Sequence, residues 1–218
     1  MTLAQEIAVL NIEAAKNTPP EVAEAFQNTI TNWISSHIEN DALKDGEKIP
    51  SFQLKNANGE QVSFDDLLKQ GPIVISFYRG GWCPYCNLEL KALQNHLSEI
   101  EKYNGALVAI SPELPDNSLT TIEKNALAFQ VLTDRNLEVA KQFGLAIQLP
   151  EIIEDMTQNI FGLDLAKING TNTFDLPIPA TYVIDMEHVV RYAYVNPNFM
   201  QRAEPTKIVE ILKIFKII

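Results

Sequence analysis

The chain has 218 residues, of which 46% are hydrophobic and 21% are charged, a balance that is typical of a globular protein with a buried core. Its 17 Lys and Arg residues and 28 Asp and Glu residues give a net charge of −11, which argues against a nucleic-acid-binding protein with a basic surface. Neither a secretory signal nor an apolar run of the roughly 18 residues that a membrane anchor requires is visible, so we expect a cytoplasmic protein.

The N-terminal segment is predicted to form two helices. Apolar residues recur at steps of three and four between residues 2 and 38, and Pro19-Pro20 interrupts the pattern. The segment contains no predicted strand, so its apolar faces must pack on the rest of the chain or on a second copy. We therefore divide the chain into an N-terminal helical extension, residues 1–44, and a domain of residues 45–218, and we consider a homodimer formed through the N-terminal helices.

A βαβ unit is predicted near the start of the domain. Residues 73–78 form an almost continuously apolar run, typical of a strand that is buried on both faces. Pro84 suits the first turn of a helix, which we expect to continue to about Tyr103, and residues 106–110 form the next buried strand. The two strands of such a unit are parallel.

The other predicted elements complete an α/β domain. They are a hairpin at 52–54 and 61–64, helices at 65–69, 119–128, 136–143 and 149–159, a strand at 130–132, a hairpin at 181–185 and 189–195, and a helix from Pro205 onward. This order predicts a three-layer α/β fold with a mixed central sheet.

The chain contains two cysteines, Cys83 and Cys86, three residues apart. A C-x-x-C pair without a secretory signal indicates redox chemistry or half of a zinc site. A structural zinc site needs two more ligands, and the three histidines are scattered without ligand spacing. We therefore predict a redox pair and no metal site.

The position of the pair at the start of a helix predicts different roles for the two sulfurs. A helix N-terminus stabilises a thiolate, which is the nucleophilic form of cysteine. Cys86 is in phase with Leu90 on the apolar stripe and is expected to be the more buried thiol, whereas Cys83 at the helix cap is expected to be more exposed. On this reasoning Cys83 attacks and Cys86 resolves.

Pro179 precedes the strand that begins at Thr181. A cis Ile178–Pro179 bond would turn the N–H and carbonyl of Ile178 outward, where they could hold an extended peptide. The alternative is an ordinary trans proline at the start of an edge strand.

Two sets of motifs resemble known families. Residues 77–86, with Trp82 before Cys83-Pro84-x-Cys86, and residues 179–185 resemble the thioredoxin superfamily, whose pattern is Trp-Cys-x-x-Cys and a cis proline before a strand. Residues 46–52, 59–67 and 107–113 are similar to the peroxiredoxin family of alkyl hydroperoxide reductase and thiol-specific antioxidant proteins. The resemblance covers about residues 46–212 and implies a thioredoxin-like fold, to which the N-terminal helices are an addition.

The resemblance also implies an activity, which is the reduction of hydrogen peroxide or organic hydroperoxides. A thiolate attacks the O–O bond, the resulting sulfenic acid condenses with the second thiol, and a thioredoxin- or glutaredoxin-type donor reduces the disulfide. Neither a metal nor an organic cofactor is required.

The chain departs from the peroxiredoxin pattern at three positions. In that alignment the attacking sulfur is Cys86, Cys83 replaces a Thr or Ser, and Arg79 replaces a Pro. Pro179 stands where the family carries an Arg that polarises the peroxide, and Arg79 or Arg202 is a candidate replacement.

Three functions are therefore considered. The first is a peroxidase that cycles between a Cys83–Cys86 dithiol and disulfide. The second is a thioredoxin-like oxidoreductase that acts on protein disulfides without an efficient peroxidase step, and the third is a non-catalytic interaction protein.

Overall fold

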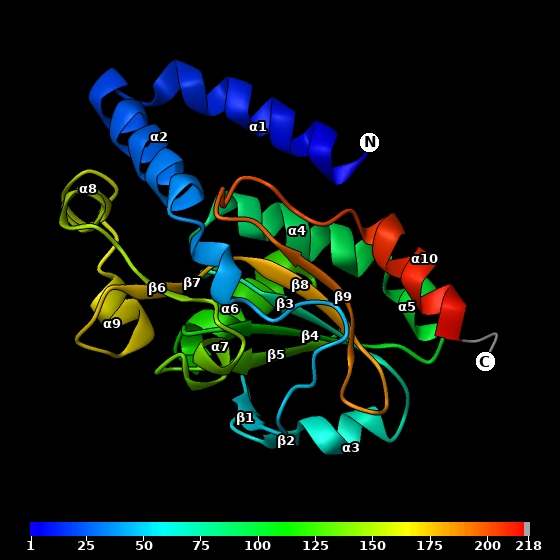
Figure 1. Ribbon diagram of the computed structural model, residues 1–218. Coiled ribbons are helices and arrows are strands. Elements are labelled where there is room, and N and C mark those ends of the chain that lie inside the picture. Colours follow the sequence, from blue (N-terminus) through cyan, green and yellow to red (C-terminus); the bar gives the residue numbers. More distant parts are fainter. Residues whose placement is uncertain (216–218) are drawn as a thin grey trace.

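A central sheet organises the chain, with strand order β2-β1-β5-β4-β3-β8-β9 in the computed structural model (Figure 1). The structure describes residues 1–215, so the last three residues of the predicted 45–218 domain lie outside the described part. The strands of this sheet are β1 (Gln53–Asn56), β2 (Gln61–Ser63), β3 (Ile73–Phe77), β4 (Ala106–Ser111), β5 (Gln130–Thr133), β8 (Ala180–Ile184) and β9 (Val190–Val195). β3, β4 and β5 are parallel, whereas β8 and β1 pair antiparallel with them, which confirms the predicted mixed sheet.

Helices on both faces of this sheet produce the predicted three layers (Figure 1). The helices are α1 (Leu3–Asn17), α2 (Pro20–Ser35), the 3-10 helix η1 (Ile38–Asp41), α3 (Phe64–Leu68), α4 (Pro84–Asn95), α5 (Leu97–Glu101), α6 (Pro115–Asn125), α7 (Glu138–Gln142), α8 (Glu151–Asn159), α9 (Leu165–Asn169) and α10 (Pro205–Phe215). Ile75 of β3 belongs to the core with α3 and α7, and its neighbour Val74 belongs to the core with α4, α5 and α10. Successive residues of a strand point to opposite faces, so β3 must be apolar throughout.

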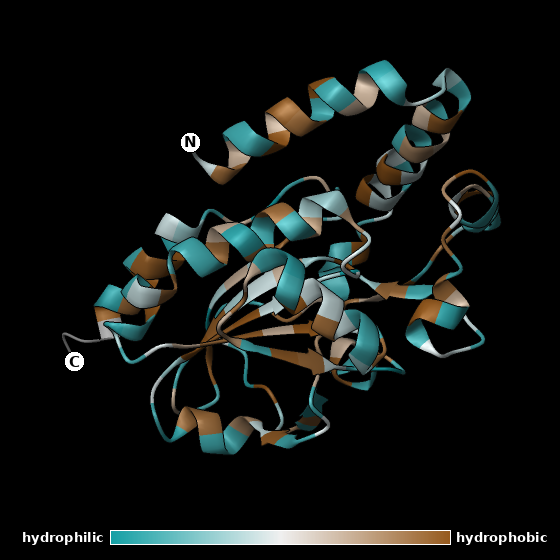
Figure 2. Ribbon diagram, turned by 180° about the vertical axis from the view of Figure 1, so that it is seen from behind, coloured by the Kyte–Doolittle hydropathy of each residue, from teal (hydrophilic) through white to brown (hydrophobic). Residues whose placement is uncertain are grey.

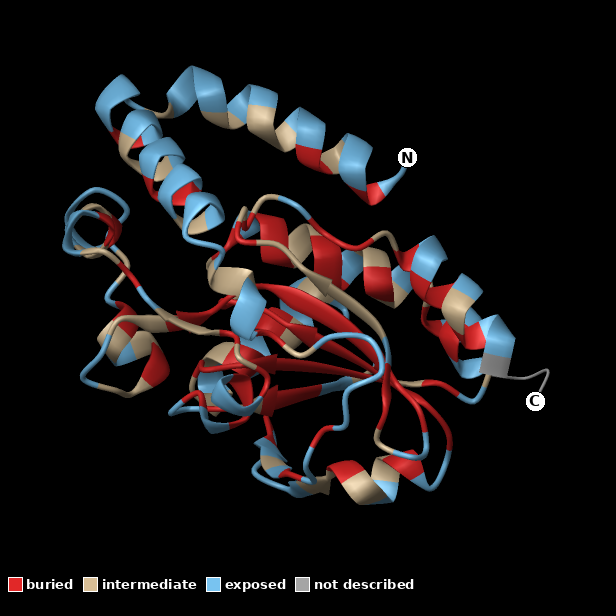
Figure 3. Ribbon diagram, in the orientation of Figure 1, coloured by how far each residue is buried: buried red, intermediate tan, exposed pale blue. Residues whose placement is uncertain are grey.

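The central strands are buried and largely hydrophobic along their length (Figures 2 and 3). This explains why the continuous apolar run predicted β3 correctly. β3 pairs with β4 in parallel, Ile75 facing Val108, and with β8 antiparallel, Ser76 facing Thr181. The carboxyl end of β3 therefore lies beside the start of β8, at the edge of the sheet where Cys83 and Cys86 follow.

The structure divides the predicted helix from Pro84 to Tyr103 into α4 and α5. The division falls at His96, whose backbone leaves the helical region with φ −104° and ψ 4°. The ring Nδ1 of His96 lies 2.9 Å from the carbonyl oxygen of Ala92. In a continuous helix this oxygen would accept the backbone N–H of His96 instead.

Two further segments differ from the sequence prediction. α6 begins at Pro115, earlier than expected, because a proline at the first helical position loses no hydrogen bond. The segment between α7 and β8 forms a small antiparallel sheet of β6 (Ala146–Gln148) and β7 (Asp175–Pro177), which carries α8 and α9 between its strands.

The two predicted N-terminal helices are confirmed, and they pack on the rest of the same chain. Leu3 and Ala4 at the start of α1 donate their backbone N–H groups to the carboxylate of Glu204, at 3.2 and 2.7 Å. Farther along α1, the hydroxyl of Tyr85 in α4 donates to Asn11 Oδ1 at 2.7 Å. α1 is therefore fixed to the domain at two points. None of the helices in residues 1–215 is both long and apolar enough to cross a membrane.

The close contact between η1 and the residue that follows the end of α7, Gly144, can be tested by substitution. Gly162, which has nearly the same φ and no such contact, is the control. Gly144 has φ +67°, and a Cβ there would lie 1.9 Å from the Asp41 carbonyl oxygen. Gly162 has φ +66° with open space around it. We expect Gly162→Ala to lower the free energy of unfolding by about 1 kcal/mol, and Gly144→Ala by about 3 kcal/mol because it adds the backbone clash. Urea denaturation measures both, and equal losses would contradict the observed contact.

Candidate active site

Cys83 and Cys86 lie at the start of α4, where helix geometry exposes unpaired N–H groups. Cys83 is the N-cap, Pro84 is the first helical residue, and Cys86 is the third. Both thiols are free, and both residues are fully buried, with 0% of their surface exposed. The expectation that Cys83 would be the more exposed thiol is therefore wrong. Residues outside α4 cover its cap: Leu3, Ile7, Ile30, Tyr78 and Phe199 belong to the same apolar cluster.

Each sulfur has a guanidinium beside it. Arg79, in the loop after β3, donates from Nη2 to Cys83 Sγ at 3.3 Å. Arg202, from the loop of residues 196–204, donates from Nη2 to Cys86 Sγ at 3.5 Å. This loop crosses over α4 between β9 and α10 (Figure 1). Both arginines that the sequence offered as replacements are thus brought to the pair.

Buried acceptors hold Arg202 in place. Its Nε lies 2.6 Å from Glu89 Oε2, and the side chains of this ion pair are each only 2% exposed. Thr181 donates its hydroxyl to Glu89 Oε1 at 3.0 Å. Arg202 also donates from Nη1 to the carbonyl oxygens of Gln201, at 2.8 Å, and Phe199. Sequence reasoning missed Glu89, although a charged residue three positions after Cys86 and four before Leu93, on the same helix face as both, was a signal.

Aromatic rings hold Arg79. Its guanidinium carbon lies 4.0 Å from the centroid of the Phe199 ring and 5.1 Å from that of the Trp82 ring. Cation–π attraction orients the guanidinium without neutralising its charge, which remains available to Cys83. Phe199 was also missed, because it is distant in sequence from the C-x-x-C motif.

The environments of the two thiols separate their pKa values. Burial disfavours a charged Cys83, but the hydrogen bond from the Cys86 thiol and the charges of Arg79 and Arg202 outweigh burial, so the pKa of Cys83 lies well below its ordinary value. Burial and the neighbouring Cys83 raise the pKa of Cys86 well above its ordinary value. Of the two coupled thiols, Cys83 is therefore the one that ionises more readily, and Cys86 is the one that retains its proton more strongly.

A further buried acid, Glu113, lies next to the pair and was not predicted as a site residue. Its Oε2 accepts the backbone N–H of Gly81 at 2.9 Å, and the residue is 2% exposed. Burial, with a contribution from the charge of Cys83, raises its pKa to about 7, against the opposing hydrogen bond from Gly81. Glu113 therefore titrates near neutral pH.

The cis bond expected before Pro179 does not occur. No peptide bond within residues 1–215 is cis. The backbone N–H of Ile178 donates to the Leu145 carbonyl at 2.8 Å, and Ile178 is 1% exposed, so its backbone does not face outward to hold a peptide. The reason is that β7 pairs with β6 and draws Ile178 into that small sheet. The bond is trans, as in the alternative, but the strand that follows is not an edge strand, since β8 lies between β3 and β9.

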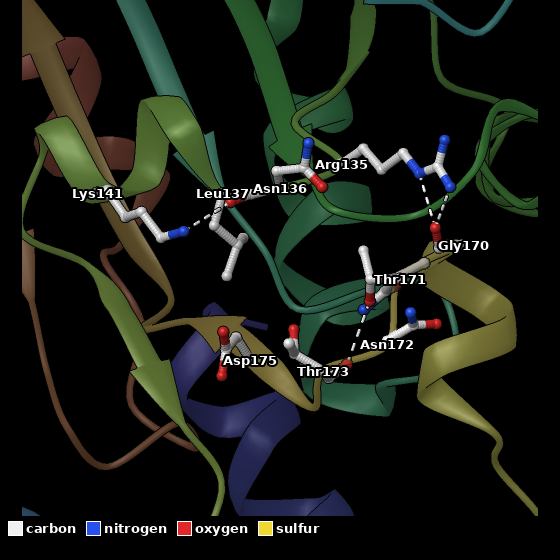
Figure 4. A pocket seen from close by; sticks show the side chains of 10 residues that line it. Arg135, Asn136, Leu137, Lys141, Gly170, Thr171, Asn172, Thr173 and Asp175 are labelled. Carbon is white, nitrogen blue, oxygen red and sulfur yellow. Dashed lines mark hydrogen bonds between the residues drawn. The ribbon is translucent and has the colours of Figure 1, made fainter.

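Two cavities bear on ligand binding. One of about 680 Å³ adjoins the cysteines and is lined in part by Arg79, Trp82, Pro84 and Phe199. The other, of about 380 Å³, is polar and lies beside α7 and the loop after α9 (Figure 4). None of the residues predicted for the site lines this second cavity. Among residues 1–215, no three His, Cys, Asp or Glu side chains are grouped so that they could hold a metal ion.

The pKa of Glu113 predicts a pH dependence of stability. Because its folded pKa of about 7 exceeds its ordinary value of 4.5, the folded state retains this proton between those pH values, and stability falls as the pH rises through this window. Glu113→Gln has no proton to lose in this window, so its free energy of unfolding should fall by about 3 kcal/mol less than that of the wild type over the same rise in pH. Urea denaturation at about pH 5 and about pH 8 measures the two slopes, and a Glu113→Gln slope equal to that of the wild type would contradict the assignment.

The guanidinium of Arg79 is expected to govern the ionisation of Cys83. In Arg79→Met the thiolate loses a neighbouring positive charge, so the pKa of Cys83 should rise by about one unit or more. The pH dependence of thiolate ultraviolet absorbance measures it. Arg135→Met is the matched control, since Arg135 is exposed and donates to the Gly170 carbonyl at 2.7 Å. An unchanged pKa in Arg79→Met would show that Arg79 does not act on Cys83.

Comparison with known proteins agrees with this fold and motif. Peroxiredoxin Bcp of Escherichia coli (strain K12) is 31% identical over 103 residues, 47% of this chain and 65% of that protein. The chloroplastic peroxiredoxin Q of Populus jackii is 27% identical over 151 residues, 69% of this chain and 60% of that protein. The chain thus spans less than two thirds of each relative.

The solved structures agree with the predicted thioredoxin-like fold. The crystal structure of peroxidoxin BcpB from Mycobacterium tuberculosis superposes with a TM-score of 0.62 at 20% identity, covering 79% of this chain and 97% of that one. The model of the AhpC/TSA family matches residues 46–193. Since this match spans more than half of the 218 residues and includes both cysteines, the chain belongs to the AhpC/TSA family.

Proposed function

We propose that the protein is a thiol-dependent peroxidase that reduces hydrogen peroxide or organic hydroperoxides through a Cys83–Cys86 dithiol–disulfide cycle. The observation that carries this proposal is the free, fully buried Cys83, whose sulfur lies 3.3 Å from the Arg79 guanidinium and next to Cys86 in the C-x-x-C motif. The neighbouring charges lower the pKa of Cys83. Membership of the AhpC/TSA family and the resemblance of the chain to proteins named peroxiredoxin support it.

In the oxidative step the Cys83 thiolate attacks the terminal oxygen of the peroxide. The S–O bond forms as the O–O bond breaks, and the departing hydroxide or alkoxide takes a proton from solvent. Arg79 faces the reacting sulfur, where a fixed positive charge stabilises the negative charge that passes from sulfur to oxygen. Arg79 therefore takes the role that the family gives to the arginine replaced here by Pro179.

In the second step the Cys86 thiol condenses with the sulfenic acid of Cys83. An S–S bond forms and water leaves. Arg202 beside Cys86 favours the thiolate form of this second sulfur during the attack. A thioredoxin- or glutaredoxin-type dithiol then returns two electrons to the disulfide. Because both cysteines are fully buried, this reductant requires the 196–204 loop or the N-terminal helices to move aside.

Burial favours the peroxidase over the thioredoxin-like alternative. In the oxidative step a peroxide is small enough to enter the cavity that Arg79 lines beside Cys83, whereas a folded protein disulfide requires an exposed sulfur. Self-association through the N-terminal helices stays a prediction. Val9, Ile12 and Ile34 on these helices are the exposed apolar residues that such contact would cover. A cytoplasmic location also stays a prediction, as does the division at residue 45.

Single-turnover oxidation by hydrogen peroxide tests the function and the roles of the two sulfurs. The reduced wild type should react much faster than free cysteine and lose both thiols to a disulfide. Cys86→Ser should accumulate a sulfenic acid on Cys83, because the resolving thiol is missing, and Cys83→Ser should react slowly. A wild type that reacts no faster than free cysteine would refute the peroxidase. Sulfenic acid that forms in Cys83→Ser and not in Cys86→Ser would assign the attack to Cys86.

A further inference from the structure

The cavity of about 680 Å³ adjoins the reactive end of the site. Arg79, Trp82 and Phe199 line it, and Arg79 is the residue that donates to the Cys83 sulfur. Cys83 has no exposed surface and does not itself line the cavity, so Arg79 is the residue that connects the cavity to the sulfur. The cavity is within the range of roughly 300 to 1,000 Å³ that is usual for small-molecule sites, and it is far larger than hydrogen peroxide requires.

The chemistry of the walls selects against charged ligands. Arg79 is the one charged residue among the described residues that line the cavity, and its charge is already directed at Cys83. Aromatic side chains form much of the wall: Phe26, Trp82, Tyr85, Phe161 and Phe199. Phe26 stands between two of them, with ring centroids 6.0 Å from both Phe161 and Phe199. Such a surface binds an uncharged apolar body.

The N-terminal helices supply one side of this cavity. Leu10 and Ala14 of α1, and Phe26 and Ile30 of α2, line it opposite the start of α4. The two anchors of α1, at Glu204 and at Tyr85, hold this side in place. Both helices precede residue 46, where the match to the AhpC/TSA family begins, so this wall is an addition to the family's matched region.

We propose that α1 and α2 form a binding site for the apolar body of a bulky, uncharged organic hydroperoxide, whose O–O group then reaches Arg79 and Cys83. The inference rests on the proposed peroxidase and specifies its substrate class. In the reaction the Cys83 thiolate forms an S–O bond with the terminal oxygen, the O–O bond breaks, and the organic alkoxide takes a proton from solvent and leaves as the alcohol. The N-terminal extension is thereby a specificity element.

Two variants on α1 and one after α8 distinguish binding at this site from the general effect of a substitution. Ala14 is half-buried on the cavity wall, and Ala8 is exposed elsewhere on α1. Ala14→Phe fills the site, Ala8→Phe is the matched control, and Phe161→Ser removes an aromatic wall that is 46% exposed and therefore tolerant of substitution. Single-turnover oxidation with cumene hydroperoxide and with hydrogen peroxide gives a ratio of rate constants for each protein. Calorimetric titration of the reduced protein with cumyl alcohol, which cannot oxidise it, measures binding alone.

The wild type should prefer cumene hydroperoxide. Ala14→Phe should lower the ratio roughly tenfold or more, which is the discrimination typical of an altered apolar pocket. Phe161→Ser should lower it in the same direction, both variants should weaken cumyl alcohol binding, and Ala8→Phe should change neither quantity. A ratio that stays constant in Ala14→Phe and Phe161→Ser would overturn the inference even with an active peroxidase. Binding of cumyl alcohol without oxidation by either peroxide would instead overturn the proposed function, and the substrate class with it.

Discussion

A thiolate that is fully withdrawn from water needs compensating positive charge, and the structure around α4 supplies it. Arg79 and Arg202 face the two sulfurs, and Glu89 offsets one of these charges. When Glu89 and Cys83 are both ionised, their two negative charges equal the two positive charges of the guanidiniums. Burial raises the pKa of both buried acids. For Glu89 the charge of Arg202 and the hydrogen bond from Thr181 oppose the rise, whereas Glu113 has only the backbone N–H of Gly81 and its pKa rises to about 7.

The charges meet because three distant parts of the chain converge at one end of the sheet. The loop after β3 carries Arg79 and leads into the start of α4, where Cys83 and Cys86 lie. β8 brings Thr181 alongside, and the 196–204 loop returns over α4 with Phe199 and Arg202. Phe199 connects the two halves of the site, since its ring supports Arg79 and its carbonyl accepts from Arg202. The 196–204 loop is thus both the cover of the cysteines and the carrier of one of their counter-charges.

Part of this arrangement lies outside the matched family region, residues 46–193. Arg202, Phe199 and the two N-terminal helices all fall beyond it. The matched region supplies the sheet, the cysteine motif, Arg79 and Glu89, and the flanking segments add Arg202 beside Cys86 and part of the apolar cluster around the two sulfurs. Chains with the same C-x-x-C motif and different flanks should differ in thiol reactivity, because Arg202 and part of the apolar cluster around the cysteines lie outside the motif.

The sequence by itself determined the layered α/β fold and the location of the reactive pair. A continuous apolar run such as residues 73–78 indicates a buried strand, and a proline directly after Cys83 indicates the start of a helix, without any contact from distant segments. It also put forward Arg79 and Arg202. It did not determine the burial of Cys83 or the isomer of the Ile178–Pro179 bond, and the expectation was wrong in both cases. Only the tertiary structure decided them: the cover of Cys83 comes from α1, α2 and the 196–204 loop, and the course of Ile178 is set by the pairing of β6 with β7. Contacts between segments so distant in sequence leave no periodic pattern in either segment, so they become visible only when the chain is folded.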